Sequence, residues 1–265
     1  MEEKQVKDSA QMSFWDHLDE LRGTLFRSIV IVFVFSIVLF CFKGFVFDGF
    51  VFGPSRSDFI FYRLLGLDFN MSLINIDLSA QFFVHMKISF ILGLILGLPF
   101  VVYELWKFIA PALYENEKSA VRKSFGSAGL LFYLGNAVGY YLVLPVSLNF
   151  FQTYSVSEAV VNTISLNSYI SMFTSMVLLM GVVFEFPVLI AVASRLGLIT
   201  RQTLRKYRRH AICIILILSA IITPSDPFSM IVVAIPLYIL FECSVIVCRK
   251  GEDEVEEEEP GEAGA

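Results

Sequence analysis

Charged residues are scarce in this sequence: only 17% of its 265 residues are Asp, Glu, Lys or Arg. The basic residues form no long stripe with interleaved aromatic residues, so nothing indicates nucleic-acid binding. The four cysteines, Cys41, Cys213, Cys243 and Cys248, form no CxxC pair. This spacing argues against a zinc site and against a disulfide framework. We therefore expect neither a metal nor a cofactor.

Apolar residues dominate instead. They make up 56% of the chain, Phe occurs 27 times, and the mean hydropathy is +0.71. The apolar runs show no polar face, which is typical of helices that cross a lipid bilayer. We predict six spans, at residues 25–42, 82–108, 126–148, 169–196, 210–222 and 228–247. The fifth is short and could form a re-entrant hairpin with the sixth, although we favour two true spans.

Four of these spans contain a proline: Pro99, Pro145, Pro187 and Pro236. In a membrane such prolines kink helices more often than they end them, because packed neighbours satisfy the freed carbonyl groups. We therefore predict an all-α fold of six transmembrane helices that forms a curved wall with a concave groove.

Lys and Arg gather in alternate connecting segments, which predicts the orientation of the chain. One set of segments is rich in them, whereas the other set has only Lys43, Arg56 and Arg63, all in one long loop. This bias places both termini in the cytoplasm. We divide the chain into a cytoplasmic segment at residues 1–24, a six-span domain at 25–247 and an acidic tail at 248–265, which we expect to be disordered.

Two carboxylates lie within predicted spans, where a charge is costly. Glu185 is near the middle of the fourth span, and either faces a polar cavity or is a protonated group bonded to a neighbouring helix. Glu242 is near the end of the last span, and we expect it to reach the interface and to have a structural role.

Carboxylates also accompany aromatic residues in two segments at the predicted cytoplasmic surface. Residues 13–25 have one apolar helical stripe, which predicts a short amphipathic helix on the membrane surface. Residues 106–118 combine Trp106 and Phe108 with Glu117. These segments either bind something cationic or form solvated faces with local ion pairs to Lys118 or Arg122.

Six motifs follow one another over nearly the whole chain: His17-Leu18-Asp19-Glu20-Leu21-Arg22, Trp106 to Tyr114 with Glu117, Leu131 to Gly135, Phe184-Glu185-Phe186-Pro187, Thr223-Pro224-Ser225-Asp226 and Ala234 to Tyr238. Together and in this order they resemble the TatC family of the twin-arginine protein translocase. Two positions depart from the family pattern. Glu104 replaces a neutral polar residue, and Met230 stands near a position that is often polar.

The resemblance implies a receptor subunit and no enzymatic activity. TatC proteins bind Arg-Arg signal peptides of folded precursors at the cytoplasmic face of the bacterial inner membrane. They recruit single-span TatA-type and TatB-type proteins, and the proton-motive force drives export. Self-association is also expected.

Carried over by motif, the peptide site comprises Glu20, Glu117, Phe108, Trp106 and Arg22. Three further positions follow in the same way: Glu185 is the membrane-embedded polar site, and Asp226 and Pro224 belong to the periplasmic cap and partner region.

Two other classes of protein are weaker interpretations. A proton-coupled secondary transporter could use Glu185 and Glu242, but no internal repeat relates the two halves of the chain. An intramembrane protease could use Ser127, but no histidine is placed by the sequence to activate it.

Overall fold

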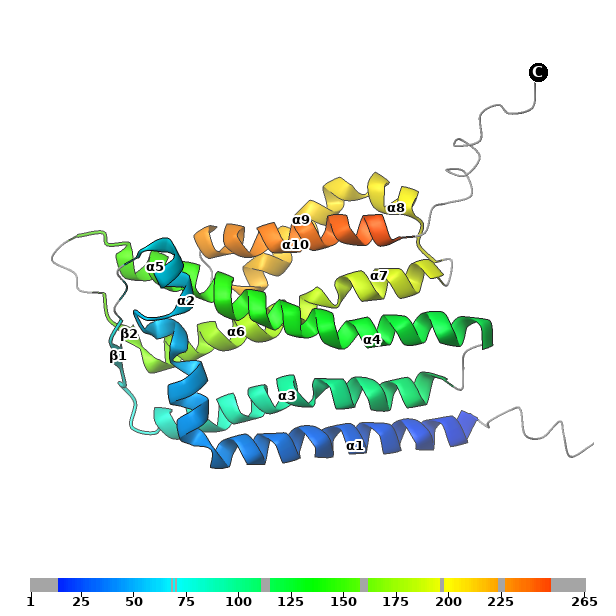
Figure 1. The fold of residues 1–265 in the computed structure, drawn as a ribbon, viewed down its shortest axis with the longest axis horizontal. Coiled ribbons are helices and arrows are strands. Elements are labelled where there is room, and N and C mark those ends of the chain that lie inside the picture. Colours follow the sequence, from blue (N-terminus) through cyan, green and yellow to red (C-terminus); the bar gives the residue numbers. More distant parts are fainter. Residues whose placement is uncertain are drawn as a thin grey trace, which may run out of the picture.

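The computed structural model describes residues 14–67, 69, 71–110, 115–157, 162–195, 198–223 and 227–248, with the backbone alone at 14–16, 115–125, 195 and 247. This part of the chain is almost entirely helical (Figure 1). The elements are α1 (Phe14–Cys41), η1 (Phe45–Val51), η2 (Gly53–Ser55), α2 (Ile60–Leu65), β1 (Leu73–Ile74), α3 (Ala80–Ile109), α4 (Glu115–Val138), η4 (Gly139–Val143), α5 (Leu144–Thr153), β2 (Ile164–Ser165), α6 (Leu166–Phe184), α7 (Phe186–Arg195), α8 (Arg201–Lys206), α9 (Arg208–Ile222) and α10 (Pro227–Val247).

Five helical stretches of the described chain are long and apolar enough to cross a membrane: His17–Cys41, Ala80–Ile109, Gly126–Thr153, Leu166–Ser194 and Pro227–Ile246. They match five of the six predicted spans. The remaining one, α9, has 15 residues and so extends about 22 Å, less than the roughly 30 Å of a bilayer core. The all-α membrane fold is confirmed, whereas the sixth span stays a prediction.

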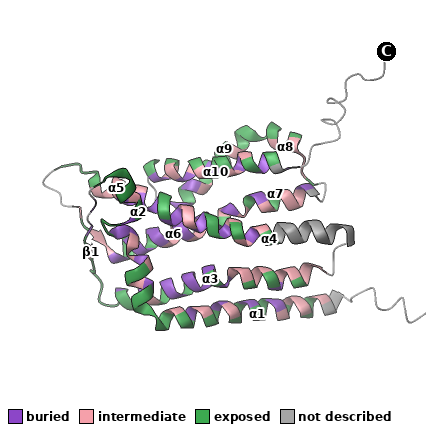
Figure 2. Ribbon diagram, in the orientation of Figure 1, coloured by how far each residue is buried: buried purple, intermediate pink, exposed green. Residues whose placement is uncertain are grey.

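The long helices follow one another in a row. α1 packs on α3, α3 packs on α4 and α6, and α10 packs on α7 and α9. Figure 1 shows α1 and α9 at opposite edges of this row. Exposed residues cover much of α1, and buried ones concentrate on the middle helices (Figure 2). An open row agrees with a wall of helices, and the concave groove remains a prediction.

α1 is one continuous helix. The segment predicted as a short amphipathic helix at residues 13–25 runs, from Phe14 on, without interruption into the first span, and its place at the membrane surface stays a prediction. Between these parts the sequence has no proline, and Gly23 alone does not break the helix. The apolar stripe noticed in the sequence is simply the first part of a longer helical face.

Small residues bring α1 and α3 together. Thr24, Ser28 and Ser36 are buried at intervals that place them on one face of α1. Across the interface, a Cβ atom on Gly93 would lie 2.8 Å from the backbone nitrogen of Ser36. Helices in lipid associate through such close packing of small residues, because burial of apolar surface contributes little to helix association where the surrounding lipid is also apolar.

The prolines act in two ways. Pro99 and Pro236 lie inside α3 and α10, as predicted. Pro145 follows the π-helical turn η4, and Pro187 is the second residue of α7. At Pro187 the span divides into α6 and α7 with Glu185 between them, because proline cannot donate the backbone hydrogen bond that would continue α6.

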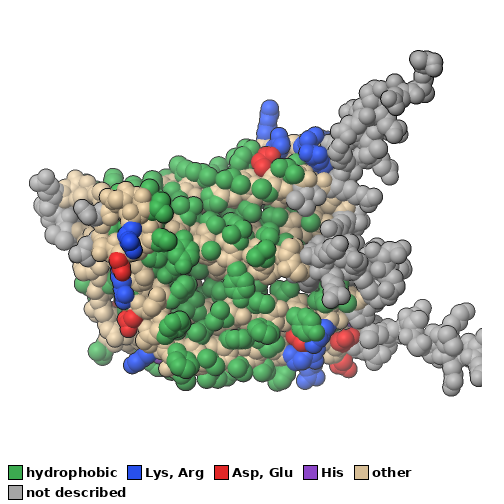
Figure 3. Space-filling model, in the orientation of Figure 1, with side chains coloured by type: hydrophobic (Ala, Val, Ile, Leu, Met, Phe, Trp, Pro, Cys, Tyr) green, Lys and Arg blue, Asp and Glu red, His purple; other side chains and the backbone are tan. Residues whose placement is uncertain are grey.

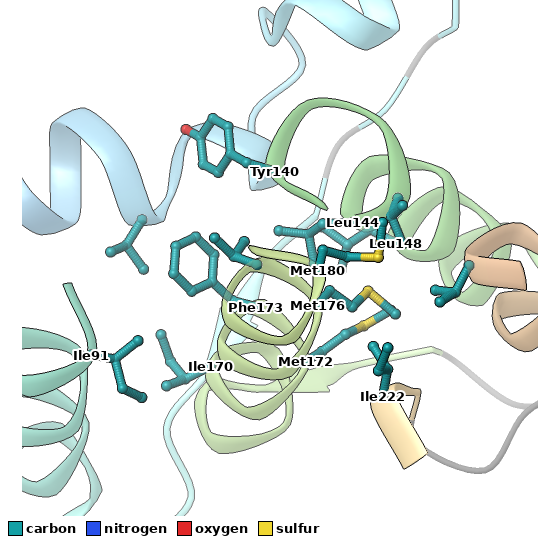
Figure 4. Close-up of a cluster of buried hydrophobic side chains, with 14 of the residues drawn as sticks. Ile91, Tyr140, Leu144, Leu148, Ile170, Met172, Phe173, Met176, Met180 and Ile222 are labelled. Carbon is teal, nitrogen blue, oxygen red and sulfur yellow. The ribbon is translucent and has the colours of Figure 1, made fainter. Parts of the chain in front are cut away.

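The core surrounds α6. Figure 4 shows side chains of α6 from Ile170 to Met180 meeting Tyr140 and Leu144 on one side and Ile222 on another. Three of these core residues are methionines, whose flexible thioethers fill irregular gaps between helices. α6 is therefore the central support of the row.

Residues 45–79, here called the cap, fold over one end of the helices. β1 of the cap pairs in parallel with β2, with Leu73 opposite Ile164. Three buried tyrosine hydroxyls donate hydrogen bonds to cap carbonyl oxygens: Tyr62 to Pro54 at 3.0 Å, Tyr140 to Phe50 at 2.8 Å and Tyr169 to Val51 at 2.5 Å. Burial also raises the pKa of the Tyr62 hydroxyl above its usual range. The long loop of the sequence is thus a folded cap.

We expect Tyr169→Phe to loosen the cap, because the carbonyl oxygen of Val51 would lose its donor. The expected loss is about 1 kcal/mol of unfolding free energy, measured by thermal unfolding in detergent. Tyr141→Phe is the matched control, since Tyr141 is exposed. Equal shifts in the two variants would contradict the prediction.

Candidate functional site

The end of the molecule opposite to the cap brings α1 and α3 together. There the rings of His17 and Phe108 stack with centroids 4.4 Å apart. Glu20 is one helical turn after His17, on the same face of α1. It is half-buried, and its Oε2 atom is buried without a hydrogen-bond partner among the described residues. A carboxylate oxygen in that state is ready to accept a hydrogen bond from a ligand.

Trp106 and Arg22 occupy other faces of these helices. Trp106 is two residues before Phe108, and Arg22 is two residues after Glu20. Two residues along an α-helix rotate a side chain by about 200° around the helix axis. Arg22 is exposed, and Trp106 is half-buried in the last turn of α3. The ring of Phe108 contacts α1 beside Glu20, through His17.

The remaining predicted residues are only partly visible. Glu117 belongs to the first turn of α4, but its side chain lies outside the described residues. Pro224 and Asp226, between α9 and α10, lie outside them altogether, as does the acidic tail from residue 249 onward. Their roles stay predictions.

An ion cluster that the sequence reasoning missed lies next to the site. The carboxylate of Glu104 accepts a hydrogen bond from Arg27 Nε at 2.6 Å and from Lys107 Nζ at 2.9 Å. Arg27 also donates to Thr24 Oγ1 at 3.2 Å. The cluster joins α1 to α3, and on α3 Glu104 is one turn before Phe108. The sequence did contain a signal for this ion pair, because Arg27 and Glu104 have opposite charges and lie in two consecutive apolar runs.

Glu185 lies at the break between α6 and α7. It is half-buried, and its Oε1 atom has no hydrogen-bond partner in the described part of the chain. The carboxylate is next to the backbone of Phe132 in α4, whose carbonyl oxygen accepts a hydrogen bond from Asn136 at 2.7 Å. Glu185 therefore belongs to a small polar spot among apolar helices, which fits either of its two interpretations.

Glu242 is paired. Arg208 Nη2 is 2.7 Å from one carboxylate oxygen, and the Tyr238 hydroxyl donates to the other at 3.1 Å. The ion pair joins α9 to α10 at the end opposite to the cap. This agrees with the structural role expected for Glu242 and leaves it poorly suited to carry protons.

These features define a class: a multispanning helical membrane protein with polar groups collected where its helices end. The model of the family described as Sec-independent protein translocase protein (TatC) matches residues 16–236. The chain therefore belongs to the TatC family, and it is a component of the Sec-independent protein translocase. Its role is in protein transport, and it is a membrane protein of the bacterial inner-membrane type.

Relatives and solved structures agree with this assignment. The TatC protein of Blattabacterium sp. subsp. Periplaneta americana is 38% identical over 252 residues, covering 89% of this chain and 95% of the relative. That of Escherichia coli (strain K12) is 34% identical over 233 residues, covering 88% and 86%. A crystal structure described as the twin arginine translocase receptor TatC superposes with a TM-score of 0.72 at 32% identity, covering 87% of this chain and 97% of that one.

Proposed function

We propose that this chain is the signal-peptide receptor of a twin-arginine translocase. It binds the Arg-Arg pair of a precursor through Glu20 and Glu117, with Phe108 beside them. Two observations support the proposal: the similar crystal structures are of a twin arginine translocase receptor, and one carboxylate oxygen of Glu20 is buried without a hydrogen-bond partner among the described residues.

The observation that carries the proposal is the carboxylate oxygen of Glu20, which has no hydrogen-bond partner among the residues that the structure describes. A buried polar atom without a hydrogen bond is costly, so a ligand that supplies a donor gains affinity there. A guanidinium group matches a carboxylate with two parallel hydrogen bonds and keeps its charge at physiological pH. Lysine supplies the positive charge but cannot form the two parallel hydrogen bonds. This difference is a reason for the site to require arginine in the signal peptide.

The remaining steps follow the family resemblance. Both termini are cytoplasmic, which places Glu20 and the start of α4 at the cytoplasmic face. The apolar part of the signal peptide inserts along the helices near Glu185. TatA-type and TatB-type proteins dock on α9 and α10 near Pro224 and Asp226, and the proton-motive force drives export.

The test is binding of a labelled Arg-Arg signal peptide to the purified chain in lipid nanodiscs. Loss of one charge-assisted contact, in Glu20→Ala or Glu117→Ala, is expected to raise the Kd about tenfold or more. The double variant should bind still more weakly. Changing the peptide pair to Lys-Lys should have a similar effect, since it removes the bidentate geometry.

Asp19→Ala is the matched control, because Asp19 is the exposed neighbour of Glu20 in the same helix. It removes the same charge from a different helical face, and binding should stay within about twofold of the unmodified chain. If Asp19→Ala and Glu20→Ala weaken binding equally, the effect is only one of net charge and the site assignment fails.

A further inference from the structure

We propose that the acidic segment at residues 252–262 binds the exposed cationic surface of α8 and the start of α9. This surface, the basic patch, consists of the exposed Arg205, Lys206 and Arg209, with the half-buried Arg201 beside them. The contact is separate from the proposed peptide site, and it does not depend on the receptor function.

The basic patch has an excess of positive charge. Five of the ten residues from 201 to 210 are Arg or Lys, and residues 186–225 contain no Asp or Glu. Glu242 of α10 pairs with Arg208 at 2.7 Å. Lys206 and Arg209 are exposed, and no residue of α8 is buried. Figure 3 shows blue side chains gathered over this end of the molecule, with red atoms next to them.

The last described residue before the acidic segment lies beside the patch. α10 ends at Val247, and the thiol of Cys248 donates to Ser194 Oγ at 3.1 Å and lies 3.8 Å from the carbonyl oxygen of Ile199. Ile199 is followed by Thr200, the residue that caps α8. The described chain therefore ends, at Cys248, next to the first turn of α8.

Charge and reach both suit this occupant. Residues 252–262 contain eight carboxylates, at Glu252, Asp253, Glu254, Glu256, Glu257, Glu258, Glu259 and Glu262. Fourteen residues can span roughly 46 Å when extended, whereas α8 is about 9 Å long. A single exposed ion pair contributes little binding free energy. However, the short tether to α10 keeps the acidic segment at a millimolar effective concentration around the basic patch. Several weak pairs are then sufficient to hold the segment in place.

The test is zero-length carbodiimide cross-linking of the full chain in phosphatidylcholine nanodiscs. This reagent joins a carboxylate to an amine that touches it, and mass spectrometry identifies the pairs. Links from the acidic segment to Lys206 are expected, and none to Lys43 or Lys87 at the cap end. Links to Lys250, which precedes the segment, serve as an internal reference, so the result is the ratio of Lys206 to Lys250 links.

Charge attraction predicts how that ratio changes. It should fall about fivefold or more in 0.5 M NaCl, because salt screens exposed pairs. Arg209→Glu should have the same effect without altering the reactive lysine. Arg56→Glu, an exposed arginine of the cap, is the matched control and should leave the ratio unchanged.

Three results would overturn the proposal. If neither salt nor Arg209→Glu changes the ratio of Lys206 to Lys250 links, the acidic segment is close to Lys206 only because it is tethered nearby, and charge attraction does not hold it there. Links made mainly to Lys107 would place the segment over the ends of α1 and α3 instead. Loss of the Lys206 links when phosphatidylglycerol replaces phosphatidylcholine would show that anionic headgroups occupy the patch in a membrane.

Discussion

Gly135→Ala is expected to destabilise the fold, although alanine is the better helix former. A Cβ atom on Gly135 would lie 2.6 Å from the carbonyl oxygen of Met180 and 2.7 Å from Cβ of Phe184. The first of these atoms is backbone, so α4 and α6 would have to move apart. Overpacking of this kind costs about 1–3 kcal/mol, and leucine should cost more.

The measurement is thermal unfolding of the purified chain in detergent. Gly129→Ala is a control from the same helix, since a Cβ atom there meets nothing within 4 Å. That change should stabilise α4 by up to about 1 kcal/mol, so the two substitutions are expected to have opposite signs. A Gly135→Ala protein as stable as Gly129→Ala would show that α4 and α6 are not held in close contact.

The second large effect is expected at Glu104. Substitution with glutamine leaves Arg27 and Lys107 without their shared carboxylate, so the two cations repel each other where α1 meets α3. Because Glu104 lies one turn from Phe108, we expect the site around Glu20 to lose its geometry. Binding of an Arg-Arg peptide should weaken severalfold, as measured in nanodiscs.

Two comparisons separate positioning from general stability. Glu242→Gln breaks an ion pair of similar length, 2.7 Å against 2.6 Å, that lies away from the site, and it should leave peptide binding unchanged. In a double-mutant cycle, Arg27→Met together with Glu104→Gln should be no worse than Glu104→Gln alone. Additive losses would mean that Arg27 and Glu104 act independently.

Sequence reasoning reached the class of fold and the family, but not the contacts between helices. Hydropathy is a local property, so five of the predicted spans agree with helices that are long enough to cross a membrane. The sequence did not show that the amphipathic segment continues into the first span, because an amphipathic stripe looks the same at the start of a long helix as in a short one. α9 shows the limit of the same method, since its 15 residues do not decide whether it crosses the membrane.

The sequence predicted which residues belong to the site, but it did not predict how their side chains are arranged. The sequence placed Glu20, Phe108 and Trp106 together, but the helical rotation between residues 106 and 108 directs their side chains to different faces. It left Glu104 unexplained, and the structure shows Glu104 paired with Arg27, 77 positions away. Pairing at that separation depends on the register of α1 against α3, which no local pattern contains.

The sequence by itself determined that this chain is a multispanning membrane protein of the TatC family, with carboxylates close to the ends of its helices. Tertiary structure alone decided that Glu20 has an oxygen without a partner in the described part of the chain, that Glu104 joins α1 to α3, and that Gly135 permits α4 and α6 to touch. The physical reason is that membrane insertion depends on the summed hydrophobicity of each segment. Helix packing in lipid depends instead on which small and polar groups meet across an interface.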